Sequence, residues 1–126
     1  MNDPEQLPLR VFYRIVWTNP PTIHDVQANP SLLTRPRVGN PEYLRLQTGI
    51  SVFRTLAQAR RTAIARPPWS GDGYIARIVI PDDAEFRIER TTKSRGHYTL
   101  WADSKAILSW IDAVEPVKIA EDFTHG

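Results

Sequence analysis

The 126-residue sequence contains no cysteine. A disulfide framework, a thiolate metal site and a cysteine nucleophile are therefore excluded. This absence agrees with a reducing compartment, and we expect a cytoplasmic protein. Histidine is also scarce, and His24, His97 and His125 stand far apart without an H-x-H or HExxH pairing. We therefore expect no metal cofactor.

Long apolar runs and glycine-rich motifs are missing as well. The longest apolar runs are far shorter than the roughly 18–20 residues that span a bilayer. Residues 1–6 lack the basic and apolar regions of a secretory signal. We expect no membrane association. Gly71-Asp72-Gly73 indicates only a turn, and the sequence contains neither a phosphate-binding glycine loop nor a G-x-S-x-G elbow.

What is present is typical of one folded domain. The apolar fraction of 41% and the charged fraction of 24% are ordinary for a globular protein, and the length suits a single core. We expect a flexible N-terminus over residues 1–9, a domain over 10–119 and a polar tail over 120–126. No internal repeat divides the chain.

Basic residues are unevenly divided, because the chain has thirteen arginines and only three lysines. A guanidinium is a planar fork of donors that matches phosphate and carboxylate oxygens. The arginines therefore slightly favour phosphate contacts, and the simpler explanation is a codon bias that places arginine on a solvated surface. The net charge of +2 creates no strong long-range field.

The order of apolar and turn-forming residues predicts an α+β domain. Alternating or β-branched segments predict strands, and capping residues before 3.6-residue periodicity predict helices. Because βαβ alternation is absent, we expect a mixed or mainly antiparallel sheet of five to six strands with two or three packed helices. Strands are expected at 10–17, 49–54, 74–80, 86–90, 97–101 and 114–119, and helical segments at 22–29, 41–46, 56–66 and from 103 onward past Ile111.

Arg14 is the most informative candidate for a site. It stands in an otherwise apolar strand, where it shares a face with Phe12 and Val16, so we expect it to point into a core or a cleft. A buried guanidinium needs an anionic or well-bonded partner. That partner is either structural, with Glu89 and Asp103 as candidates, or a phosphate of a ligand.

Two further segments suggest polar chemistry. Ser51 lies in a strand that leads into a capped helix, and a helix N-terminus near Ser51, Arg54 and Thr55 attracts anions. Alternatively, Ser51 is hydrogen-bonded within the sheet. In the segment 89–101, His97 is a candidate general base or phosphate ligand and Glu89 a candidate catalytic carboxylate. The alternative is a solvated hairpin.

Tyr13-Arg14 in the first strand, followed by Gly49-Ile50-Ser51 and a helix through Arg61, resembles RES-type toxins and the ADP-ribosyltransferase-like fold over residues 10–66. The resemblance implies an NAD cofactor in a cleft between two small sheets and a place in a toxin–antitoxin system.

The resemblance also implies roles for individual residues. Arg14 would bind the pyrophosphate beside Tyr13, Ser51 would orient the ribose, and Glu89 or His97 would support cleavage of the nicotinamide–ribose bond. No E-x-E or Q-x-E follows in the chain, so the later carboxylate departs from the pattern. Binding of a nucleotide without turnover is therefore an equal expectation.

Two other functions compete with the nucleotide hypothesis. A protein-interaction module of the immunity, antitoxin or phage-inhibitor type would use an exposed patch made of Trp69, Trp101, Arg66, Arg95 and Tyr98. Nucleic-acid binding would use arginines that follow a phosphate backbone and aromatic rings that stack on bases, and it is the weaker expectation at this net charge. The arginines considered for it are Arg35, Arg37, Arg60, Arg61 and Arg66.

Overall fold

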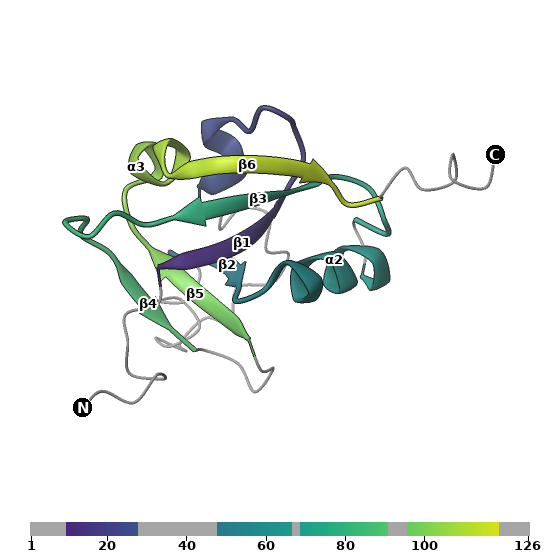
Figure 1. Cartoon of the computed structure of the whole chain (residues 1–126), viewed down its shortest axis with the longest axis horizontal. Coiled ribbons are helices and arrows are strands. Elements are labelled where there is room, and N and C mark those ends of the chain that lie inside the picture. Colours follow the sequence, from purple (N-terminus) through teal and green to yellow (C-terminus); the bar gives the residue numbers. More distant parts are fainter. Residues whose placement is uncertain (1–9, 28–47, 67–68, 91–95, 119–126) are drawn as a thin grey trace, which may run out of the picture.

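The computed structural model describes residues 10–27, 48–66, 69–90 and 96–118 (Figure 1). They form a six-stranded sheet with two α-helices and one short 3-10 helix. In chain order the elements are β1 (Val11–Val16), η2 (Ile23–Val26), β2 (Ile50–Phe53), α2 (Leu56–Ala65), β3 (Tyr74–Val79), β4 (Arg87–Glu89), β5 (His97–Trp101), α3 (Ser104–Ser109) and β6 (Ile111–Pro116).

The strands are ordered β4-β5-β2-β1-β3-β6, and every neighbouring pair is antiparallel. The predicted α+β class with a mainly antiparallel sheet is confirmed. The first strand lies inside the sheet, because its apolar residues are packed on both faces. The described strands belong to one sheet, in contrast to the alternative of two separate small sheets.

The sheet is nevertheless weakly joined in its middle. β1 and β3 share six register pairs, and β2 and β5 share four, whereas β1 and β2 share only Tyr13↔Phe53. The two three-stranded groups, β4-β5-β2 and β1-β3-β6, therefore meet at a single backbone pair and diverge beyond it (Figure 1). We call this junction between β1 and β2 the seam.

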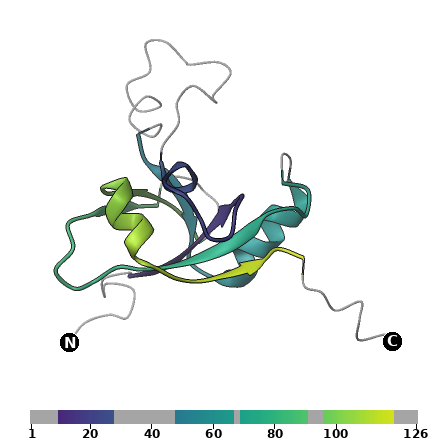
Figure 2. The ribbon, with the colours of Figure 1, turned by 90° about the horizontal axis from the view of Figure 1, so that it is seen from above.

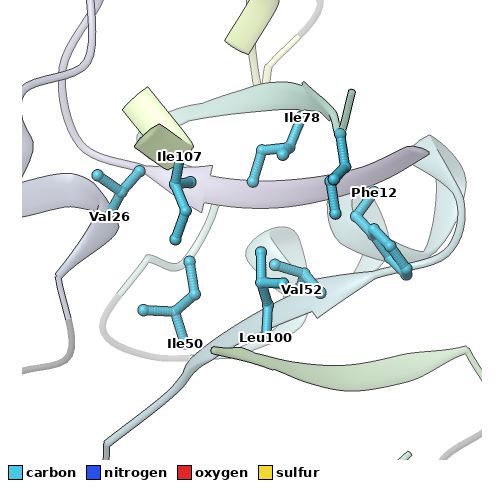
Figure 3. Packing of buried hydrophobic residues seen from close by; sticks show 8 residues of the cluster. Phe12, Val26, Ile50, Val52, Ile78, Leu100 and Ile107 are labelled. Carbon is cyan, nitrogen blue, oxygen red and sulfur yellow. The ribbon is translucent and has the colours of Figure 1, made fainter. Parts of the chain in front are cut away.

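Each face of the sheet has its own apolar core. On one face Phe12, Val52, Ile78, Leu100 and Ile107 are fully buried, together with residues of η2 and α3, as Figure 3 shows. On the other face α2 packs through Ala59 and Ala63 against β1, β2 and β3. In Figure 2, α3 lies on the left and α2 on the right. Because apolar side chains of β1 point alternately to the two faces, this strand contributes residues to both cores.

The helix starts follow their capping residues. The side chain of Thr55 accepts a hydrogen bond from the backbone N–H of Gln58, and Asp103 accepts one from Ala106, as expected for N-caps of α2 and α3. Several boundaries differ from prediction, and those of β6 change the type of element. Ile111, expected on the last helix, opens β6, and β6 ends at Pro116 and not at 119. These residues form a strand because their backbone pairs with β3. Local periodicity does not reveal such pairing between distant segments. The helical turn expected at 41–46 lies outside the described residues.

Candidate functional site

Arg14 lies in the seam, one residue after Tyr13. Tyr13 is the residue of β1 that pairs with β2, and the backbone ladder between the two strands does not continue to Arg14. Its Nη1 donates to the carbonyl oxygen of Ser51 at 2.9 Å, and its Nε donates to the carbonyl oxygen of Asp25 at 2.6 Å. The side chain therefore bridges β1 to β2 and to η2 at the place where backbone ladder bonds are missing. The prediction that Glu89 or Asp103 is the partner of Arg14 is wrong, because main-chain carbonyls accept the hydrogen bonds of its guanidinium.

The guanidinium of Arg14 is partly buried and has no direct counter-ion among the described residues. Within the described residues no carboxylate lies within 4.0 Å of it, and its Nη2 makes no hydrogen bond. Burial lowers the pKa of Arg14 to about 10, against an opposing effect of the negative charge of Asp25. The group stays protonated at neutral pH, so the seam holds a poorly solvated positive charge.

Asp25 organises the loop that faces Arg14. Its Oδ1 accepts from the backbone N–H of Trp17 at 2.8 Å, and its Oδ2 accepts from the hydroxyl of Thr18 at 2.7 Å and the backbone N–H of Thr22 at 2.9 Å. Burial favours the neutral acid, but these donors outweigh it and lower the pKa of Asp25. The helical segment expected at 22–29 thus begins with a contact between Thr22 and Asp25, and the sequence did not predict the link from Asp25 to Arg14.

The side chains of Ser51 and Glu89 lie on the other face of the sheet. Ile50 and Val52 belong to the same core as Phe12, so the intervening Ser51 points away from that core and is exposed. Register places Ser51 opposite Thr99, and Thr99 opposite Glu89, in one row across β2, β5 and β4. The structure thus brings the Ser51 carbonyl to Arg14 but does not bring the Ser51 hydroxyl or the Glu89 carboxylate to it.

Tyr13 also faces away from Arg14. It lines a half-open hollow of about 110 Å³ between α2 and β6, together with Arg77 and Glu115. Arg77 forms a two-pronged ion pair with Asp112, at 2.7 and 2.8 Å, and Arg60 is paired with Glu115. Because these charges already compensate one another, the hollow is a weaker site for a charged ligand than the seam.

Arg54 and His97 complete the predicted set. Arg54 is exposed just before α2, and its backbone N–H donates to Gly96. The ring of His97 contacts the ring of Phe53 at a tilt of 56°, with centroids 5.3 Å apart, on the face that carries α2. Neither side chain is beside the guanidinium of Arg14. The structure therefore separates Arg14, at the seam, from the side chains of Tyr13, Ser51, Glu89 and His97 on the opposite face.

His97 predicts a dependence of stability on pH. Burial, and secondarily the charge of Arg66, lowers the pKa of His97, so the unfolded chain binds this proton more readily. The free energy of unfolding should fall as pH drops from the ordinary histidine range, roughly 6.5, through the lower folded value. Urea unfolding between pH 7.5 and 5 should show a shallower fall in His97→Gln. The exposed His24→Gln is the control, and an unchanged slope in His97→Gln would contradict the prediction.

The aromatic patch predicted for a protein partner is not one surface. Tyr98 packs against Phe12 in the core with ring centroids 5.7 Å apart, whereas Trp101 lies on the opposite face of β5 under Arg87. Trp69 is partly buried against the core beneath α2. Strand alternation separates neighbours that the sequence presents together, and Arg95 lies outside the described residues.

No group of three or more His, Cys, Asp or Glu side chains suited to a metal ion occurs in the described ranges. Within the same part of the chain, no helix is long and apolar enough to cross a membrane. Comparison with protein-family models, with curated proteins and with solved structures finds no match to this chain.

Proposed function

We propose that the chain binds an anionic nucleotide of the NAD class, with Arg14 as the ligand for its phosphates. The observation that carries the proposal is the guanidinium at the seam, which two carbonyls hold in place while Nη2 has no partner among the described residues. Even partial burial of a cation without a direct counter-ion is unfavourable, and an incoming phosphate would offset that cost.

The orientation of the Arg14 guanidinium suits a phosphate group. The carbonyls of Asp25 and Ser51 orient the guanidinium plane, so its free donors point in a fixed direction, which suits bidentate contact with phosphate oxygens. The two residues whose carbonyls accept from Arg14 flank the segment 28–47 in the sequence, since Asp25 precedes it and Ser51 follows it. A ligand at Arg14 would thus bridge β1, η2 and β2.

Binding without turnover is the form of the proposal that the geometry favours. The cleavage chemistry implied by the resemblance needs a carboxylate or hydroxyl beside the bound ribose, whereas Ser51 and Glu89 project from the opposite face. An ADP-ribosyl transfer or NAD glycohydrolase activity of this chain would therefore require other groups than these two side chains.

Thermal unfolding in the presence of NAD, ADP-ribose, ATP and pyrophosphate tests the proposal. A ligand that binds only the native state at about 100 times its dissociation constant should stabilise the protein by roughly 2.7 kcal/mol. Arg14→Lys should lose this gain, because a lysine ammonium cannot hold both carbonyls and grip a phosphate with two donors.

Arg77→Gln is the matched control, since Arg77 is also on a central strand but is paired with Asp112 on the other face. Circular dichroism of each variant separates loss of binding from loss of fold. The proposal fails if folded Arg14→Lys keeps the full ligand-induced gain, or if none of the four compounds stabilises the wild-type protein.

A further inference from the structure

The stretch 43–71 carries five arginines and no aspartate or glutamate. It includes β2, all of α2 and the turn that follows the helix. The helix itself has no acidic residue in its first turn, where acids are usually favourable. This stretch is therefore positive in sequence, although the whole chain carries a net charge of only +2, and the exposed Asp72 and half-exposed Glu115 lie beside its described part.

Three of these arginines are available to a partner. Arg54 precedes α2, Arg61 lies in its middle and Arg66 is its C-cap, and all three are exposed. Within the described ranges none of them forms an ion pair or a side-chain hydrogen bond. They are distributed along a ten-residue helix about 15 Å long. By contrast, Arg60 bonds Glu115 and the carbonyl of Val117, so it is structural.

Two indole rings lie at the C-terminal end of this helix. A Cβ built on Gly73 would be 3.8 Å from Cε3 of Trp17 and 3.9 Å from Cδ1 of Trp69, so both rings border the bare glycine. The turn that holds Trp69 is fastened to α2, because the N–H of Gly71 donates to Ala63 at 2.8 Å. Trp17 remains 50% exposed.

We propose that this surface, formed by Arg54, Arg61, Arg66, Trp17 and Trp69, binds single-stranded nucleic acid. Exposed arginines without an ion pair in the described ranges suit a polyanion, and an exposed indole offers a π-face on which a base can stack without sequence preference. A protein partner would more often meet both signs of charge at its rim. The surface is distinct from the seam, since α2 and Arg14 lie on opposite faces of the sheet.

Fluorescence anisotropy with a labelled 12-nucleotide single-stranded RNA and the matching DNA tests the inference. Three arginine–phosphate contacts give a slope of log K against log salt of about −2, so affinity should fall roughly 20-fold between about 50 and 200 mM salt. The double variant Arg61→Gln/Arg66→Gln should weaken binding and flatten this slope. Trp17→Leu should weaken binding roughly 10-fold and reduce the quenching of tryptophan fluorescence.

Arg87→Gln is the control, because it removes one positive charge, against two in the double variant, from an exposed position on the far edge strand β4. The inference is overturned by absence of binding at the lower salt concentration, by equal weakening in Arg87→Gln, or by equal displacement with poly-glutamate, which would indicate an acidic protein. Oligonucleotide binding and the NAD-induced gain in stability are separate readouts, so this inference and the proposed function can fail independently.

Discussion

Replacing Asp25 with alanine is expected to destabilise the fold by about 2–4 kcal/mol, which corresponds to a loss of roughly 10 °C in the melting midpoint. The carboxylate accepts from Trp17 N–H, Thr18 Oγ1 and Thr22 N–H at 2.7–2.9 Å, and the variant leaves two backbone donors without it. Because the Asp25 carbonyl also holds Arg14, loosening of η2 should weaken the seam as well. Urea unfolding measures the loss.

Asp82→Ala provides the control, since its side chain is fully exposed and its contact with Arg10 is long, at 3.7 Å. We expect a change within about 0.5 kcal/mol there. A loss below about 1 kcal/mol in Asp25→Ala would show that the hydrogen bonds to this carboxylate contribute little net stability.

Asp25 also makes the free energy of unfolding depend on pH in the acidic range. The pKa of Asp25 is lower in the folded chain than in the unfolded chain, so its contribution is complete above the ordinary aspartate value of roughly 3.9. The contribution is lost as pH falls through the lowered folded value. Asp25→Ala should therefore show a flatter stability profile than the wild type between about pH 5 and pH 2.

Phe12→Ala should cost about 3–5 kcal/mol, the range for removing a buried phenylalanine. Its side chain is 0% exposed among Ile78, Val52 and Leu100, and its edge-on contact with Tyr98 adds to the loss. This core lies where the two three-stranded groups diverge, so the cavity that Phe12→Ala leaves would lie beside the seam (Figure 3).

The neighbouring Val11→Ala is the matched control for Phe12, because Val11 is in the same strand but 41% exposed. Its loss should stay below about 1 kcal/mol. Phe12→Leu should fall between the two, since it leaves a smaller cavity. The urea midpoint should shift at constant slope, and similar losses in Phe12→Ala and Val11→Ala would contradict this assignment of the core.

Local sequence determined much of the fold. The apolar alternation of β1, the caps Thr55 and Asp103, and the proline and glycine turns each act through neighbours within a few residues, so their elements are confirmed with small shifts of boundary. The boundary of β6 is the exception, because Ile111 satisfies a helix pattern locally and pairs with β3 only in the folded chain.

The sequence also identified Arg14 as the unusual residue, because a guanidinium in an apolar strand needs a partner wherever the strand packs. Tertiary structure alone decided that this partner is a pair of carbonyls, from Asp25 and Ser51, and that the Ser51 hydroxyl faces the other way. Those outcomes depend on strand register and on the divergence of β1 from β2. Both arise from contacts between residues far apart in the chain, which no local pattern encodes.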